Sequence, residues 1–152
     1  LPVPLPPDAI EGLQCPMTMS LHGAKLTYVR QWKMIQLDLT TYERVELFGV
    51  YPDIDGIEGP YWSPDERSML FRIINQSKRH GYAESSRLLV VTVQDGKVTS
   101  KRKFDRFVNF VCGSSCFSIN ADDFGFRDDD TIFYRRHWAS EERPEEIDEI
   151  DL

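Results

Sequence analysis

Short apolar runs separated by turn residues constrain this fold most, because the spacing of apolar residues decides between strand and helix. The runs are rich in β-branched and aromatic residues, and none sustains the 3.6-residue spacing of a helix. They span residues 25–29, 34–39, 45–48, 68–74, 88–93, 98–104, 107–111, 116–119 and 131–134. Between two of them, Asp95-Gly96 is a strong signal for a two-residue hairpin turn. The sequence therefore predicts an all-β fold.

The chain divides into three predicted parts. Its 152 residues fit one domain, and 41% hydrophobic residues suffice for a core. Residues 1–16, with prolines at positions 2, 4, 6 and 7, are predicted to form a Pro-rich extended arm. Residues 17–139 are the expected single β domain. Residues 140–152 hold seven acidic residues and one basic residue, and we expect them to form a mobile tail.

The charge of the chain narrows the choice of partners. A net charge of −7 argues against nucleic acid or an anionic membrane surface and leaves basic proteins or neutral ligands. No apolar run approaches the roughly 18 residues of a spanning helix. The chain starts with Leu-Pro-Val-Pro instead of Met, which indicates that a leader has been removed, either by a signal peptidase or by design. The first option predicts a secreted or periplasmic protein, and we expect the periplasm.

Five residues, Cys112-Gly113-Ser114-Ser115-Cys116, can close a very small ring. A disulfide needs Cα atoms about 4.4–6.8 Å apart, which this spacing meets only in a tight turn, and Gly113 permits such a turn. The closure would stabilise the fold by roughly 2 kcal/mol and would mainly fix local shape. We expect a Cys112–Cys116 disulfide. The alternatives are a hairpin with reduced thiols and competition from Cys15, which is otherwise free and buried.

A propeller element becomes visible in Tyr61-Trp62-Ser63-Pro64-Asp65-Glu66-Arg67-Ser68. It resembles the Trp-Ser-Pro-Asp-Gly element of TolB-type, WD40-like propeller blades, in which Asp accepts backbone amides in a tight turn and Trp packs into the core. The chain departs from that pattern by Glu66 in place of Gly and by a long polar insert over 75–86. The resemblance implies antiparallel sheets from two to three blade-like units in an open, incomplete propeller-like arrangement.

Catalytic and metal-binding patterns are weak in this sequence. It contains no Gly-x-Ser-x-Gly elbow, and His22, His80 and His137 lack metal-ligand spacing. The acidic stretch 122–130 could hold Ca²⁺ through carboxylate oxygens, but its spacing is not that of an EF-hand, and a solvated turn or a face for a basic partner is the alternative. We therefore expect no enzyme activity, no cofactor and no metal.

Several aromatic residues lie near predicted strand ends or turns. Most are expected in the core, and a minority near the Cys112–Cys116 ring could anchor an interface. These aromatic residues are Tyr51, Tyr61, Trp62, Phe110, Phe117, Tyr134 and Trp138.

As an ensemble, the Pro-rich start, the blade-like repeat with Trp62-Ser63-Pro64-Asp65 and the cysteine ring resemble a periplasmic type VI secretion immunity protein. The resemblance is to the one that neutralises a papain-like cysteine peptidoglycan amidase. It implies that such an amidase is the partner and that a loop occludes its Cys-His cleft. The implied partner-binding residues are Cys112, Gly113, Ser114, Ser115, Cys116, Phe110 and Phe117.

The alternative function comes from the propeller resemblance alone. A TolB-like module would bind an envelope protein along an exposed sheet edge. The first interpretation requires the loop to contact the partner, and the second requires a strand edge to do so.

Overall fold

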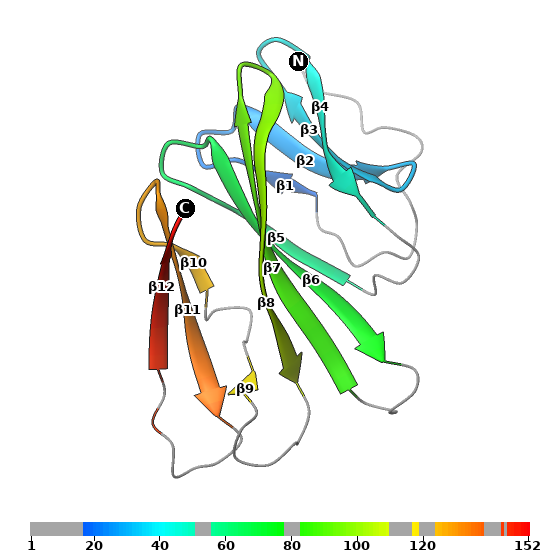
Figure 1. Ribbon diagram of the computed structural model, residues 1–152. Helices are drawn as coiled ribbons and strands as arrows, with labels where there is room; N and C mark the ends of the chain where they lie inside the picture. Colours follow the sequence, from blue (N-terminus) through cyan, green and yellow to red (C-terminus); the bar gives the residue numbers. More distant parts are fainter. Residues whose placement is uncertain are drawn as a thin grey trace.

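The computed structural model describes residues 17–50, 56–77, 83–109, 117–118, 124–138, 144 and 146–152. These residues form twelve β-strands and no helix, so the expected all-β fold is confirmed. The strands make three antiparallel sheets of four strands each, and none of the sheets closes into a barrel (Figure 1).

The first two sheets are simple meanders. The first contains β1 (Thr18–Met19), β2 (Lys25–Arg30), β3 (Lys33–Asp38) and β4 (Arg44–Gly49) in sequence order. The second contains β5 (Gly56–Trp62), β6 (Ser68–Ser77), β7 (Ala83–Gln94) and β8 (Lys97–Asn109) in sequence order. Four neighbouring strands in sequence order are the arrangement of a propeller blade. The expected blade-like units are thus present.

The third sheet has a different order. It contains β10 (Phe124–Phe126), β11 (Thr131–Trp138) and β12 (Glu146–Asp151), while β9 (Phe117–Ser118) pairs with the far end of β11. This sheet follows the other two in the stack that Figure 1 shows.

The second sheet is buried on both faces, which fixes the layer order. Alternate residues of a strand point to opposite faces. On one face, Met69, Phe71 and Val91 pack with Met34, Leu47 and Phe48 of the first sheet. On the other face, Leu70, Leu88 and Val90 pack with Phe124, Ile132 and Tyr134 of the third sheet. Burial on both faces explains why the runs 68–74 and 88–93 are almost continuously apolar.

Two local predictions are confirmed. Asp95 and Gly96 connect β7 to β8 with φ angles of 51° and 70°, which is the left-handed pair that a two-residue hairpin turn requires. Trp62 is 8% exposed and belongs to the core between the first and second sheets.

Three strand boundaries differ from the sequence prediction. β5 (Gly56–Trp62) lies between the runs 45–48 and 68–74, where the sequence predicted no strand. The polar insert 75–86 is shorter than expected, since Asn75 pairs with Ser85 and Ser77 pairs with Ala83. One strand, β8, covers the strand expected over 98–104 and the described part of the strand expected over 107–111. In each case backbone pairing with a neighbouring strand extends the sheet through residues whose side chains gave no strand signal.

The expectation of a mobile acidic tail is wrong for the last residues of the chain. Glu146–Asp151 forms β12, which pairs with β11 over six positions. Ile150 and Leu152 pack against the core between the second and third sheets, whereas Ile147 is 61% exposed. The acidic composition of this segment gave no strand signal in the sequence. On an edge strand, charged side chains can face water while the backbone pairs with the neighbouring strand.

Candidate functional site

The predicted binding loop lies outside the described residues. This holds for Cys112, Gly113, Ser114, Ser115 and Cys116, for Phe110, and also for Cys15 in the Pro-rich arm. The disulfide therefore stays a prediction. Phe117 is the first residue of β9, and its backbone pairs with that of Trp138 in β11. The loop thus follows the end of β8 in the second sheet and precedes a strand of the third sheet.

The acidic stretch proposed as an alternative calcium site is described only in part. Asp122 and Asp123 lie outside the described residues. The backbone N–H of Asp130 donates to Asp128 Oδ1 at 3.0 Å, and this hydrogen bond lowers the pKa of the Asp128 carboxyl. In the described ranges no group of three or more His, Cys, Asp or Glu residues is arranged to hold a metal ion. The described carboxylates here shape a turn.

The Trp-Ser-Pro-Asp element forms the tight turn that its resemblance implied. Ser63 N–H donates to the Ser68 carbonyl oxygen at 2.9 Å, and Ser63 Oγ accepts from Ser68 N–H at 3.0 Å. Asp65 Oδ1 accepts from Ser63 Oγ at 2.6 Å and from Arg67 N–H at 3.0 Å. Burial alone raises the pKa of Asp65, but these hydrogen bonds outweigh it and the pKa is lowered.

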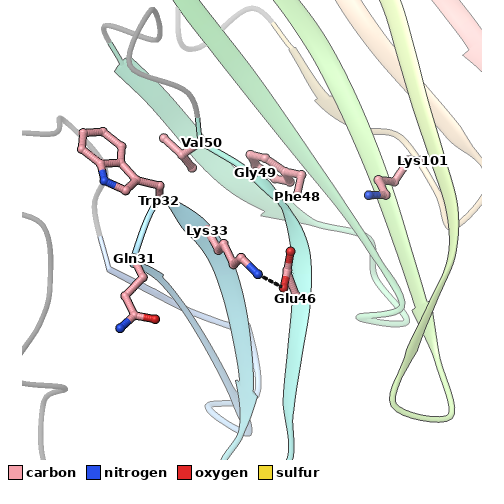
Figure 2. Close-up of a pocket in the computed structure, with 8 residues that line it drawn as sticks. All are labelled: Gln31, Trp32, Lys33, Glu46, Phe48, Gly49, Val50 and Lys101. Carbon is pink, nitrogen blue, oxygen red and sulfur yellow. Dashed lines mark hydrogen bonds and ion pairs between the residues drawn. The ribbon is translucent and has the colours of Figure 1, made fainter.

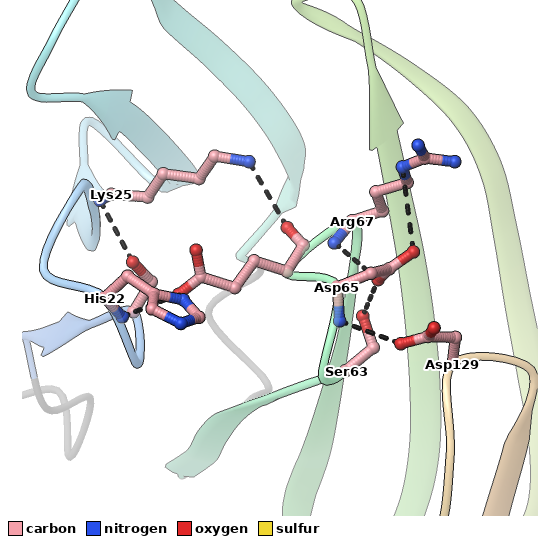
Figure 3. A network of polar contacts seen from close by, with 8 residues as sticks. His22, Lys25, Ser63, Asp65, Arg67 and Asp129 are labelled. Atoms are coloured by element: carbon pink, nitrogen blue, oxygen red, sulfur yellow. Dashed lines mark hydrogen bonds and ion pairs between the residues drawn. The ribbon is translucent and has the colours of Figure 1, made fainter.

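Glu66 connects this turn to the first sheet through His22 and Lys25, both of which are labelled in Figure 3. Glu66 Oε1 accepts a hydrogen bond of 2.9 Å from His22 N–H and lies 3.2 Å from His22 Nδ1. The Glu66 carbonyl oxygen accepts from Lys25 Nζ at 3.2 Å. Burial raises the pKa of the Glu66 carboxyl, but the hydrogen bonds from His22 and Ser20 lower it further than burial raises it.

The same turn also contacts the third sheet. Asp65 N–H donates to Asp129 Oδ1 at 2.8 Å, and Asp129 lies in the turn between β10 and β11. The five-residue turn 63–67 therefore makes hydrogen bonds to all three sheets, and its polar residues stabilise the fold.

A second turn borders a groove of about 630 Å³ between the first two sheets. Figure 2 shows this groove between the β2–β3 turn, the end of β4 and Lys101 on β8. We call it the Trp32 groove and define it by six lining residues: Trp32, Lys33, Glu46, Phe48, Val50 and Lys101. Phe48 and Val50 are almost fully buried, with 7% and 1% exposure, and give the groove an apolar floor.

Trp32 lies at the tip of the β2–β3 turn in an unfavourable conformation. Gln31 and Trp32 have φ angles of 48° and 62°, in a turn type that favours Asn-Gly or Gly-Gly. Left-handed backbone costs a residue with a side chain roughly 1–2 kcal/mol. The Trp32 carbonyl oxygen accepts from Val50 N–H at 2.7 Å, so the turn is tied to the end of β4. The side chain stays 49% exposed.

The charged residues of the groove differ in their partners. Lys33 Nζ lies 2.8 Å from Glu46 Oε2, so these two charges compensate each other. Lys101 pairs with Val91 in the sheet register, which points both side chains to the face of the first sheet. Among the described residues, no hydrogen bond or ion pair involves the Lys101 ammonium group. Within the described part of the chain, the Lys101 ammonium is therefore a positive charge of the groove without an ion-pair partner, in a protein of net charge −7.

Trp32 is the candidate residue that the sequence prediction missed. The strands expected over 25–29 and 34–39 left the turn between them unassigned. Extending both strands until two residues remain would have put Trp32 at a hairpin tip. By contrast, three of the aromatic residues named in the sequence analysis, Tyr61, Trp62 and Tyr134, contribute to the core. Tyr61 makes an edge contact with Phe124 at 4.9 Å between ring centres.

No helix in the part of the chain that the structure describes is long and apolar enough to cross a membrane. No family model matches the chain, and no curated protein is significantly similar to it in sequence.

Proposed function

We propose that this chain is a protein-binding inhibitor: a periplasmic immunity protein that neutralises a papain-like cysteine peptidoglycan amidase. The observation that carries the binding role is Trp32, a half-exposed aromatic residue held in a left-handed turn beside a groove. Tryptophan is enriched among the residues that dominate protein interfaces. Strained residues persist where the surrounding structure fixes them, and they cluster at binding sites.

The layered scaffold suits such an anchor. The second sheet is packed on both faces, and Val50 N–H holds the Trp32 carbonyl oxygen. An anchor that is ordered before binding loses less conformational entropy when the partner docks. The Trp32 groove is therefore a pre-formed surface.

The Cys112–Cys116 loop is the second element of the proposal. In the resemblance that suggests the function, Ser114 or Ser115 would enter the amidase cleft and hydrogen-bond to its catalytic Cys or His. β8 connects the two elements, since Lys101 lies eight residues before its last residue, Asn109. At 3.3 Å per residue, this separation is roughly 26 Å. A standard interface of about 800 Å² per partner is wide enough to cover that span.

Surface charge favours rapid association with a basic toxin. The exposed residues Asp128, Asp129 and Asp130 directly precede Thr131, which pairs with the exposed Asp151 of β12. Complementary charge raises association rates more than it raises affinity.

The test is inhibition of a purified papain-like amidase whose gene adjoins the gene for this chain, acting on isolated peptidoglycan. We expect stoichiometric inhibition by the wild-type chain. Trp32→Ser should weaken it about thirtyfold or more, equivalent to about 2 kcal/mol at an interface hot spot. Tyr42→Ser is the matched control, because Tyr42 is also exposed, at 60%, and also has a positive φ, but lies outside the groove.

A second variant tests the loop. Replacing Ser114 and Ser115 together by Lys should clash in a narrow cleft and reduce inhibition strongly, with an unchanged circular dichroism spectrum. If the wild-type chain does not inhibit the amidase, the proposal fails. If inhibition survives both the loop variant and Trp32→Ser, the contact lies elsewhere, and the sheet-edge alternative replaces both elements.

A further inference from the structure

We infer that the Trp32 groove binds an extended segment of the partner protein that presents a carboxylate next to an apolar side chain. This inference rests on the proposed binding role of the groove, and it adds the chemistry of what the groove recognises.

The first step is the charge of the groove. Lys33 is neutralised by Glu46 at 2.8 Å, whereas the Lys101 ammonium has no ion pair within the described residues. Figure 2 shows Lys101 extending from β8 on the bank opposite the Lys33–Glu46 pair. A bound carboxylate would complete the pairing of the charged groups in the groove. Such a charge-assisted contact is stronger than a neutral hydrogen bond.

The second step is the apolar part. The Trp32 ring, Val50 and Phe48 lie along one side of the groove, and only Trp32 is substantially exposed. An apolar side chain placed on the Trp32 ring would cover its exposed face and remove both surfaces from water. The ligand therefore needs an apolar group a short distance from its acid.

The third step is shape. The groove has β4 on one bank and β8 on the other, and each is the last strand in the order of its sheet. An open groove between two edge strands fits an extended chain better than a compact small molecule. A single-stranded nucleic acid also combines negative charge with stacking surfaces. The net charge of −7 opposes a polyanion, so a peptide with one local carboxylate is favoured.

The experiment is a selection of random decapeptides displayed on phage against the full-length chain, with counter-selection on Trp32→Ser. We expect the enriched peptides to contain Asp or Glu within two positions of a large apolar residue. Synthetic versions should bind at least tenfold more weakly to Lys101→Glu. A new selection on Lys101→Glu should instead enrich Lys or Arg at the acidic position.

Lys97→Glu is the matched control. Lys97 is an exposed lysine on the same strand, at the β7–β8 turn and outside the groove, so its reversal should leave the affinity of the peptides within twofold. Absence of any Trp32-dependent peptide would overturn the inference, and so would selected peptides that keep their acids against Lys101→Glu. Tight binding of a fluorescent oligothymidine that depends on Trp32 and Lys101 would also overturn it, in favour of nucleic acid.

The outcomes separate this inference from the proposed function. Amidase inhibition without acidic peptides would leave the immunity function intact and reject the chemistry of the groove. Selection of acidic peptides without amidase inhibition would support the chemistry of the groove and reject the immunity function.

Discussion

Of the described turns that hold residues with side chains in the left-handed region, the Glu66 turn and the Trp32 turn place those residues in different surroundings. Glu66 has a φ of 58°, is 9% exposed, and bonds through its carboxylate and carbonyl to the first sheet. Trp32 has a φ of 62° and is 49% exposed, and the described structure shows only its carbonyl oxygen hydrogen-bonded. Contacts within the chain offset the strain at Glu66. At Trp32 the described chain offers a backbone hydrogen bond but no side-chain hydrogen bond, and the exposed ring borders a groove, so we propose an external partner for it.

The Glu66 turn also explains the departure from the propeller element. Glycine at this position would adopt the same φ without strain. Glutamate at this position has a strained backbone, but its carboxylate accepts hydrogen bonds from His22. A glycine would keep the turn and lose the side-chain contact between the layers.

The largest effect on stability should come from the buried hydroxyl of the structural turn. Ser63→Ala removes the acceptor for the buried Ser68 N–H and the donor to Asp65. Leaving a buried donor without a partner costs about 2 kcal/mol. Urea unfolding monitored by fluorescence measures this loss. Ser100→Ala is the control, because it removes a half-buried hydroxyl outside this turn, and an equal loss in both variants would contradict the role of the turn.

Alanine and glycine at Glu66 should separate strain from contacts. Both variants lose the hydrogen bonds from His22, but only alanine keeps the strained φ. We expect Glu66→Ala to unfold with about 1 kcal/mol less free energy than Glu66→Gly, which should itself lie below the wild type. The same pair at Trp32 should show a similar difference. If Glu66→Gly were more stable than the wild type, the contacts would not offset the strain.

The smallest expected effect is the loss of folding stability at acid pH when the Glu66 carboxylate is protonated. The pKa of Glu66 is lower in the folded chain than its ordinary value of about 4.3. A group with a depressed folded pKa stabilises the fold above the unfolded pKa, and this contribution is lost as the pH falls through the folded pKa. The free energy of unfolding should therefore fall below about pH 4.3 less steeply in Glu66→Gln than in the wild type. Parallel pH profiles would rule out this linkage.

Much of the fold was predictable because its core strands are short apolar runs bounded by turn residues. The strands around Met69–Phe71 and Leu89–Val91 carry apolar residues toward both neighbouring sheets, so their signal is strong. β12 was missed because four of its six residues are acidic and its stability comes from pairing with β11. A propensity argument scores each segment by its own residues and does not include the strand with which the segment pairs.

The Trp32 groove was not predicted from the sequence. The sequence led to a protein-binding surface with aromatic anchors, and it placed that surface at the cysteine loop. Trp32 was not predicted as a site residue because the hydrophobicity of tryptophan is the same whether the side chain is exposed, as in Trp32, or buried, as in Trp62. The difference lies in the backbone of the turn and in the register that brings Lys101 to the facing bank.

The central claim is that a partner covers Trp32. Hydroxyl-radical footprinting of the full chain, alone and in complex with the amidase, tests it without any substitution. Oxidation of Trp32 should fall several-fold in the complex, while oxidation of Tyr42, which is more exposed in the free chain, should stay unchanged. Equal oxidation of Trp32 in the free and bound chains would contradict the account.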